Sequence, residues 1–270
     1  MKSKRFRYIF VFFAVCTACL LSACSKDGKD EAVNDSSLPE LRIGVDILEP
    51  FFYVDKNGNY TGIDAQLARE TCKRAGYKPV FVELQWSNND EYLDNGSIDC
   101  IWTASAIDGQ ENDYLWTESY LESSIGIVVQ QNSPCRTTDE LTRYSVAVRN
   151  NSKAEELFLD NVIPCSSLYT CGTNSIARTA FIKGYADCLV DHKIVLMQLV
   201  NDNPELYRFL DTELPTLHLG VAFKKDSTDG YMEKIDAALR QMRSDGTVSS
   251  IVEKYCTNTD EMEELIADGR

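Results

Sequence analysis

Apolar residues recur along this chain in two kinds of pattern, and the two kinds alternate from residue 41 onward. Short, largely apolar runs, such as residues 41–45 and 98–103, are typical of buried β-strands. A longer stretch with apolar residues three or four positions apart, at residues 65–75, is typical of an amphipathic helix. The alternation predicts an α/β architecture.

Turn and cap residues mark the first series of elements. Asp64 stands directly before the helical pattern of residues 65–75, where an aspartate commonly caps the first turn, and Gly76 follows its end. A turn around Gly58 separates two short strand-like runs and predicts a hairpin. The predicted order is strand 41–45, hairpin 52–61, helix 65–75, strand 79–84, short helix 90–93 and strand 98–103.

A similar second series follows after residue 124. It comprises strand 145–148, helix 152–159 with a capping serine, helix 174–183, strand 186–190 and helix 193–200, and two further helices occupy residues 228–243 and 248–255. Strand-like runs at residues 125–129 and 219–223 flank this series, which predicts two crossings between two lobes. Lobe one would comprise residues 41–124 and 219–270, and lobe two residues 125–218. Two crossings allow hinge closure over a ligand, whereas a single continuous sheet without a hinge is the alternative.

The first 23 residues have the pattern of an export signal. Four basic residues precede an almost wholly apolar run at residues 8–21, which is shorter than the roughly 20 residues needed to span a bilayer. The run ends in Leu21-Ser22-Ala23-Cys24, which resembles the lipobox of bacterial lipoproteins. We therefore expect cleavage before Cys24 and a diacylglycerol on its thiol, with an ordinary signal peptide as the alternative. Residues 24–40 are polar and charged and predict a flexible tether.

Charge narrows the range of partners. Without the leader, 23 Lys and Arg stand against 42 Asp and Glu, a balance near −19, compared with −15 for the full chain. A surface this acidic argues against nucleic acid and anionic lipid as partners. His192 and His218 are the only histidines, and no CxxC motif occurs after Cys24, so neither a zinc cluster nor another cofactor is expected in the mature chain.

Seven cysteines follow Cys24. Cys165 and Cys171 are close enough in sequence to close a small loop, although spacing alone does not show that they do. Cys100 and Cys188 lie in apolar strand-like runs and are expected to be buried. The full set is Cys72, Cys100, Cys135, Cys165, Cys171, Cys188 and Cys256, an odd number that leaves one unpaired if all pairing is intramolecular.

Several short blocks occur in an order and at spacings that resemble one known family. They are residues 41–46 with 50–53, 58 with 61–64, 96–101, 116–120, 183–187, 220–225 and 245–255. Together they are similar to the extracellular solute-binding proteins, family 3, of polar amino-acid ABC importers. The resemblance covers residues 41–255 and implies a two-lobed type II periplasmic-binding-protein fold with the ligand between the lobes.

The resemblance also implies roles for individual residues in the cleft. Asp191 matches the position that pairs with a ligand's α-ammonium, and Asp46 matches one that often contacts a distal polar group. Trp86 matches the position whose ring covers the ligand side chain, and Thr103 and Ala104 match positions that approach the ligand. The structural alternatives are that Asp191 caps a helix, that Asp46 is a strand-end carboxylate in solvent and that Trp86 packs in the core. Four other aromatic residues are predicted to pack in the core or at the hinge: Phe51, Phe52, Trp102 and Tyr120.

The carboxylate clamp departs from the family pattern. Gln110 stands where family members carry an arginine, and an amide lacks the charge for a bidentate ion pair. Arg149, Ser152 and Lys153 lie at a strand-to-helix turn whose N–H groups and hydroxyl contact the carboxylate in the family. Arg149 is the candidate replacement, and solvated surface charge is the alternative for both Arg149 and Lys153.

These features predict a lipid-anchored, monomeric binding subunit that delivers a small polar solute to an ABC permease and its ATPase. It would act at the outer face of the cytoplasmic membrane, or in the periplasm if an outer membrane exists. An α-amino acid held from lobe two is the first expectation, and an amine, a modified amino acid or a short peptide is the competing ligand class. Two other functions stay open: an enzyme similar to cyclohexadienyl dehydratases, with a cleft carboxylate as general acid, and a sensory protein whose closed form contacts a receptor.

Overall fold

Strands from distant parts of the chain build the first of two sheets. The order across this sheet is β4-β1-β5-β13-β6; β1 is parallel to β4 and β5, whereas β13 is antiparallel to β5 and β6. The bounds are β1 Glu40–Val45, β4 Lys78–Glu83, β5 Cys100–Ile101, β6 Tyr114–Trp116 and β13 Ala222–Lys224. The computed structural model describes residues 37–256 and 258–266, so the predicted leader, Cys24 and nearly all of the tether lie outside the described residues.

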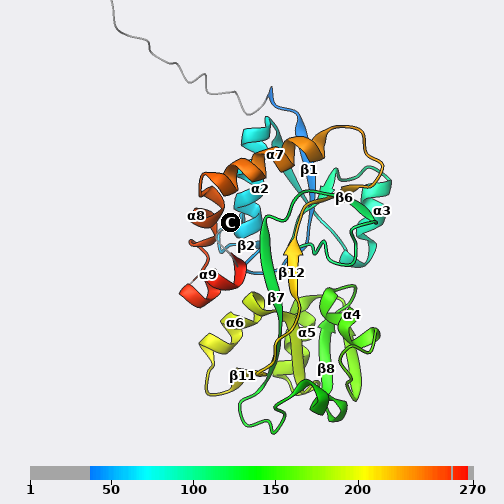
Figure 1. Cartoon of the computed structure of the whole chain (residues 1–270), viewed down its shortest axis with the longest axis vertical. Helices are drawn as coiled ribbons and strands as arrows, with labels where there is room; N and C mark the ends of the chain where they lie inside the picture. Colours follow the sequence, from blue (N-terminus) through cyan, green and yellow to red (C-terminus); the bar gives the residue numbers. More distant parts are fainter. Residues whose placement is uncertain (1–36, 257, 267–270) are drawn as a thin grey trace, which may run out of the picture. The chain divides into compact units, whose positions relative to one another are not determined.

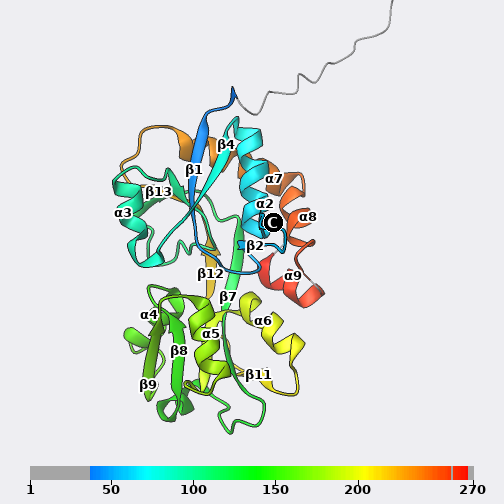
Figure 2. The ribbon, with the colours of Figure 1, turned by 180° about the vertical axis from the view of Figure 1, so that it is seen from behind.

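Helices α2, α7 and α8 pack against one another on one flank of this sheet, and α3 lies on the other (Figures 1 and 2). The further elements are α2 Ile63–Ala75, α3 Asn89–Asp94, α7 Tyr231–Ser244, α8 Thr247–Val252, the 3-10 turn η2 Trp86–Asn88 and the strands β2 Tyr53–Val54 and β3 Tyr60–Thr61. β2 pairs with β3 in antiparallel fashion, which confirms the predicted hairpin. We call the first sheet with these elements lobe one.

The second sheet has the order β11-β7-β10-β8-β9, with β8 parallel to β9 and β10, and β7 antiparallel to β10 and β11. The bounds are β7 Leu121–Gln130, β8 Ser145–Arg149, β9 Ser167–Cys171, β10 Cys188–His192 and β11 Tyr207–Phe209. Its helices are α4 Lys153–Leu159, α5 Asn174–Ile182, α6 Lys193–Asp202 and the 3-10 helix η3 Thr138–Arg143. Ser152 accepts a hydrogen bond from Glu155 N at 3.1 Å and caps α4, as predicted. We call this sheet and its helices lobe two.

Two neighbouring strands join the sheets. β12, Thr216–Leu219, pairs with the first residues of β7, and β7 then continues into the second sheet (Figure 1). On the return path, β13 begins in the first sheet directly after the two residues that follow β12. The residues at which one lobe ends and the other begins stay a prediction.

The last described helix, α9 (Thr259–Leu265), packs on α6 and β7 (Figure 2). Lys193 on α6 forms an ion pair with Glu264 at 3.1 Å, and Glu264 Oε1 also accepts a hydrogen bond from Ser124 N at 2.6 Å. The segment that was expected in lobe one therefore contacts lobe two as well. Because α9 follows the predicted series, no periodic pattern in the sequence indicated this contact.

The prediction that Asp64 caps α2 is wrong. The helix begins two residues earlier, at Ile63 after Gly62, and the N–H groups of Ile63 and Asp64 donate to the carbonyl oxygens of Pro50 and Phe51 at 3.0 and 2.8 Å. These main-chain bonds satisfy the helix start without a side chain. Gly62 has φ 116°, and a Cβ there would lie 2.3 Å from Phe51 O, so the position requires glycine.

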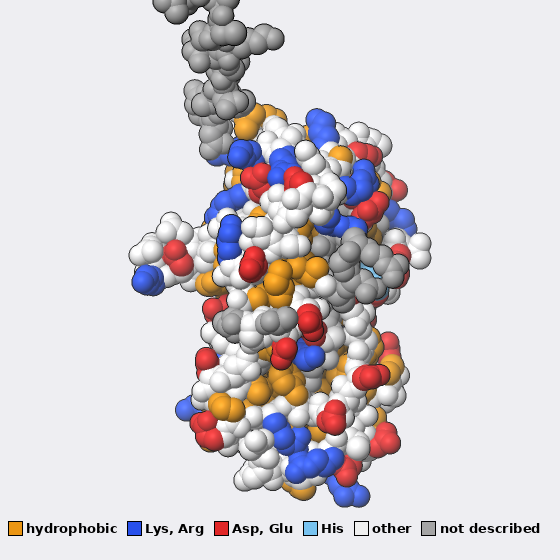
Figure 3. Space-filling view, turned by 60° about the vertical axis from the view of Figure 1, so that its left-hand side comes forward, with side chains coloured by type: hydrophobic (Ala, Val, Ile, Leu, Met, Phe, Trp, Pro, Cys, Tyr) orange, Lys and Arg blue, Asp and Glu red, His pale blue; other side chains and the backbone are white. Residues whose placement is uncertain are grey.

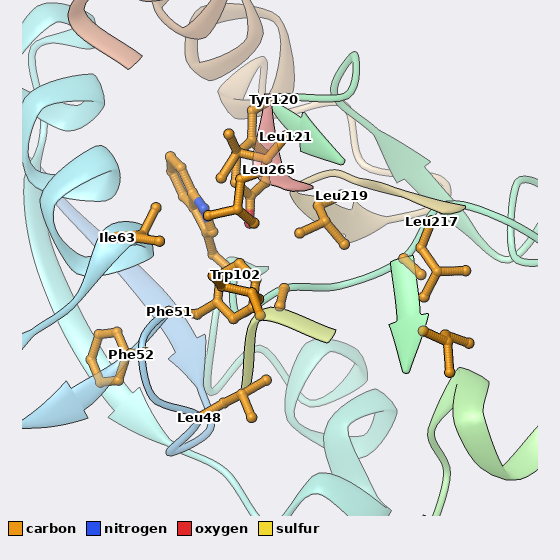
Figure 4. Packing of buried hydrophobic residues seen from close by; sticks show 14 of the residues in the cluster. Leu48, Phe51, Phe52, Ile63, Trp102, Tyr120, Leu121, Leu217, Leu219 and Leu265 are labelled. Carbon is orange, nitrogen blue, oxygen red and sulfur yellow. The ribbon is translucent and has the colours of Figure 1, made fainter. Parts of the chain in front are cut away.

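Aromatic side chains fill the centre of lobe one (Figure 4). Phe51 and Phe52 are 0% exposed, Trp102 is 1% exposed and Tyr120 is 3% exposed, which confirms their predicted core packing. The rings of Trp102 and Tyr120 lie 5.8 Å apart at 56°. Burial of each such side chain contributes about 1.5–3 kcal/mol to folding, so these four side chains stabilise lobe one.

All seven described cysteines are free thiols, and Cys100 and Cys188 are buried as predicted. Cys171 is the last residue of β9, whereas Cys165 precedes this strand. An extended strand rises about 3.3 Å per residue, so Ser167 and Cys171 lie roughly 13 Å apart, beyond the roughly 7 Å limit for bridged Cα atoms. Cys165 and Cys171 are both free thiols, so they do not close a small loop in this structure.

Acidic and basic side chains are interspersed over the face shown in Figure 3, without a large patch of one sign. Within residues 37–256 and 258–266, no helix combines the length and the apolar character that a membrane span requires.

Candidate functional site

An ion pair links the lobes where strands of both sheets end. Asp46 directly follows β1 in lobe one, and Arg149 is the last residue of β8 in lobe two. Nη1 of Arg149 donates to Oδ2 of Asp46, and the two side chains are only 8% and 15% exposed. The interpretation of Arg149 as a solvated surface charge is therefore wrong, and so is the interpretation of Asp46 as a carboxylate in solvent.

Trp86 adds two further contacts between the lobes. The guanidinium carbon of Arg149 lies 4.4 Å from the centre of the indole ring, a cation–π contact. The indole Nε1 donates to the carbonyl oxygen of Asn151 at 2.8 Å. The predicted wall of the cleft thus covers an arginine of the opposite lobe in this structure.

Asp191 lies near the end of β10, beside the same arginine. Its carboxylate accepts hydrogen bonds from the side chain of Asn174 and from His192 N, the latter at 2.8 Å. Burial raises the pKa of Asp191 to about 6, and the positive charge of Arg149 opposes this rise. A cationic group brought close to Asp191 would restore its full negative charge at neutral pH.

His192 is a cavity residue that the sequence reasoning missed. Its Nδ1 lies 3.1 Å from Ser123 Oγ, and its ring meets Phe51 edge-on at 5.7 Å. Burial first, and then the charge of Arg149, lowers the pKa of His192 to about 3. The imidazole is therefore neutral at physiological pH and supplies a polar wall without charge.

Ala104 forms part of the cavity floor in lobe one, and the buried Thr103 precedes it. The Thr103 hydroxyl donates to Trp102 O at 2.7 Å and accepts from Asp46 N at 3.1 Å, so it positions Asp46. Ala104 has φ 43°, and its N–H donates to the carboxylate of Asp64 at 2.7 Å. Asp64 also accepts from the Tyr120 hydroxyl at 2.9 Å, and it thereby fixes the backbone of the floor from below.

Three predicted residues meet at the other side of the cleft. A Cβ built on Gly109, next to Gln110, would lie only 2.9 Å from the Nζ of Lys153, which comes from lobe two. Lys153 is 14% exposed and forms an ion pair with Glu156 at 2.6 Å. The hydroxyl of Ser152 donates to Arg149 O at 2.7 Å while it caps α4, so it holds the turn between the two cations.

These residues enclose a cavity of about 40 Å³. Seven of the nine predicted ligand-binding residues line it; Asp46 and Thr103 do not, although Asp46 pairs with the lining residue Arg149 and Thr103 bonds to Asp46. Such a volume holds roughly three water molecules. The predicted lining residues are Trp86, Ala104, Gln110, Arg149, Ser152, Lys153 and Asp191, and those that were missed include Ser105, Asn151 and His192.

A groove of about 880 Å³ continues outward from this cavity and shares Trp86, Gln110, Asn151 and Lys153 with it. Seven acidic residues line the groove against three lysines. The acids are Asp90, Asp94, Asp113, Glu155, Glu156, Asp160 and Asp226, and the lysines are Lys153, Lys224 and Lys225. Within the described part of the chain no group of His, Cys, Asp and Glu is arranged to hold a metal ion.

The chain matches the model of the bacterial extracellular solute-binding proteins, family 3, over residues 41–258, and it belongs to this family. It is 26% identical over 261 residues to a probable amino-acid-binding protein, YxeM, of Bacillus subtilis (strain 168), which covers 94% of this chain and 96% of that protein. The fold is similar to an ancestral arginine-binding protein bound to arginine, with a TM-score of 0.71 and 25% identity over 80% of this chain and 97% of that one. It is also similar to the ancestral amino acid-binding protein AncCDT-1, a precursor of cyclohexadienyl dehydratase, with a TM-score of 0.72 and 25% identity over 80% and 95%.

These similarities confirm the predicted family and the two-lobed type II fold.

Proposed function

We propose that this protein captures an amino acid between its two lobes and delivers it to an ABC permease. The observation that carries the proposal is the meeting of Asp191, Arg149 and Asp46 at the strand ends of both lobes, with Trp86 over the guanidinium. Membership of a family of extracellular solute-binding proteins supports it, as does the similarity to proteins named for amino-acid binding.

Each charged group of an α-amino acid has a partner of opposite sign in this cleft. The ammonium pairs with Asp191, whose carboxylate is partly buried and lies close to Arg149. The carboxylate pairs with Arg149, whose Nε is buried and has no hydrogen-bond partner among the residues that the structure describes. Solute binding thereby replaces the ion pair between Arg149 and Asp46 with a charge-assisted bond of the same kind.

The charge of the outer groove narrows the class of amino acid. Seven acids against three lysines give the groove a negative potential, which favours the approach of neutral and cationic solutes and opposes anionic ones. Asp46, released from Arg149, would then face the solute side chain. A neutral or basic amino acid therefore fits the site better than an acidic one.

Closure of the lobes by rotation about β7 and β12 explains how a cavity of about 40 Å³ can belong to a binding site. The protein acts as a monomer in this scheme, without catalytic turnover. Cys24 carries the lipid that holds the protein at the outer face of the cytoplasmic membrane, or in the periplasm of a cell with an outer membrane. Replacement of Cys24 by serine is expected to move the protein from the membrane fraction to the soluble fraction, and retention in the membrane fraction would contradict the anchor.

A thermal-shift screen of the purified protein tests the central claim. The compounds are the twenty amino acids, L-cystine, simple amines, short peptides and prephenate. An amino acid at a hundredfold its Kd stabilises the folded state by about 2.7 kcal/mol, which raises the Tm by several degrees. X-ray scattering with the same compound should show a more compact particle. Thermal shifts with amines or peptides but with no amino acid would overturn the proposal. Consumption of prephenate by the protein, measured in a separate activity assay, would indicate an enzyme instead.

A further inference from the structure

We propose that Lys153 is a specificity-determining residue that supplies, from lobe two, the positive charge that Gln110 does not bring to lobe one. A solute carboxylate would bind between the Lys153 ammonium, the Gln110 amide and Arg149. This inference rests on the proposed function, since it concerns how an amino-acid carboxylate is recognised.

The position of the ammonium carries the inference. Lys153 is the first residue of α4 in lobe two, yet its Nζ reaches the backbone of Gly109 in lobe one. The imaginary Cβ of Gly109 lies 2.9 Å from Nζ and 3.9 Å from Cε. The charge therefore lies beside the residue that precedes Gln110, and Gln110 and Lys153 line the same cavity.

Gly109 makes this approach possible. Any side chain there would occupy the space that the ammonium fills, and the backbone has φ +75°, a conformation that glycine adopts without strain. The turn is held by hydrogen bonds that do not involve the Gln110 side chain: Gln110 N donates to Ile107 O at 2.9 Å, and Trp116 Nε1 donates to Gln110 O at 2.9 Å. The side-chain amide of Gln110 takes part in neither of these two hydrogen bonds.

The existing partner of Lys153 leaves room for a solute. Glu156 holds the ammonium at 2.6 Å, but the Glu156 side chain is 46% exposed, whereas that of Lys153 is 14% exposed. A lysine ammonium has three donors, so a solute carboxylate can bind without breaking this pair. Both Lys153 and Gln110 line the cavity of about 40 Å³, and Glu156 lines only the outer groove.

The arrangement couples recognition to closure. An arginine on lobe one would bind a carboxylate whether or not the lobes have met. Lys153 contributes together with Gln110 only when lobe two lies against Gly109. A solute without a carboxylate would therefore gain less from closure than one that has it.

The test compares an amino acid with its α-carboxamide, which lacks the negative charge. Binding of the twenty amino acids and L-cystine to the wild type by calorimetry first identifies the probe, and its carboxamide is measured beside it. Lys153→Ala should weaken the amino acid at least tenfold and the carboxamide less than twofold. Lys225→Ala is the matched control, because this lysine lines the outer groove alone, and it should change neither affinity by more than twofold.

A second pair of variants separates charge from structure. Lys153→Arg should keep most of the affinity. The double variant Gln110→Arg with Lys153→Ala should bind the amino acid at least threefold more tightly than Lys153→Ala alone, because it returns the cation to lobe one. Equal loss for the amino acid and the carboxamide, or no loss for either, would overturn the inference while the proposed function stands. A wild type that binds no amino acid would overturn both.

Discussion

Lobe one and lobe two each hold an aspartate whose pKa is raised by burial, and the two aspartates do different work. Asp64 in lobe one is 1% exposed, and burial raises its pKa to about 7. Its partners are the Ala104 N–H and the Tyr120 hydroxyl, both uncharged. Asp191 in lobe two has a pKa of about 6, lines the cavity and lies near the charge of Arg149.

The comparison shows that a raised pKa does not by itself mark a binding residue. Both carboxylates lose solvation, and both accept a hydrogen bond from the main chain. What distinguishes Asp191 is a cavity on its open side and a cation within electrostatic reach. Asp64 thus holds the floor in place, whereas Asp191 lines the cavity and is the proposed ammonium partner.

Asp191→Ala has the largest expected effect on binding. Truncating one partner of a buried charge pair costs about 2–5 kcal/mol, so amino-acid binding should fall by roughly a hundredfold or more. Isothermal calorimetry on the probe amino acid measures the loss. Asp202→Ala, an exposed aspartate at the end of α6, is the control and should bind normally. An unchanged Kd for Asp191→Ala would remove its role as the ammonium partner.

Asp64→Ala should affect stability rather than ligand recognition. It leaves the Ala104 N–H and the Tyr120 hydroxyl buried without a partner, at a cost of about 2–3 kcal/mol in the free energy of unfolding. Urea unfolding measures this cost. A loss of ligand affinity without a loss of stability would break the distinction drawn between the two aspartates.

Asp64→Asn isolates the titration. The pKa of Asp64 is about 7 in the folded protein and 3.8 in its ordinary environment, so the folded state binds the proton more tightly. The stability that Asp64 contributes is therefore complete below about pH 4 and declines as the pH rises towards 7. The free energies of unfolding of the wild type and of Asp64→Asn are measured at pH 5 and pH 8. The variant should gain stability relative to the wild type between pH 5 and pH 8. A difference that is independent of pH would show that Asp64 is not the group that titrates.

The strand-end residues were predicted from the resemblance to the family, and sheet geometry supports their placement, because strands deliver their carboxyl ends to one edge of a sheet. Asp46, Arg149 and Asp191 all follow or end apolar runs, and the structure brings them to the cleft. Asp64 was misread because a polar residue before a helical pattern is the usual sign of a cap, whereas here the carbonyl oxygens of Pro50 and Phe51 satisfy the helix start. A clue was available in Gly62, which directly precedes the first helical residue.

Contacts between residues far apart in the sequence were beyond prediction. The approach of Lys153 to Gly109 and the packing of α9 on α6 depend on how the two lobes meet. No periodic pattern of a single segment contains that information. The cleft charges could therefore be named in advance, but not which of them already pair with each other.

Arg149→Ala tests the charge that separates the two aspartates. It should weaken a carboxylate-bearing solute by tenfold or more, about 1.4 kcal/mol, and leave the carboxamide less affected. It should also raise the pKa of Asp191, since the guanidinium charge opposes that rise. Asp46→Ala is the matched variant, because it breaks the same ion pair but leaves the guanidinium available. Equal losses in Arg149→Ala and Asp46→Ala would assign Arg149 to holding the lobes together rather than to the carboxylate.

Gln110→Arg has the smallest expected effect. In a cleft without a cation at this point, an added guanidinium would gain a strong bidentate bond to the solute carboxylate. Here the Nζ of Lys153 already lies against Gly109. The guanidinium introduced at residue 110 would be repelled by this ammonium, and both cations would share one solute carboxylate. We expect tighter binding of the amino acid by only a few-fold, well under 1.4 kcal/mol. A tenfold gain in the wild-type background would mean that Lys153 contributes little at this point, and a lost thermal shift would mean that residue 110 does not face the solute.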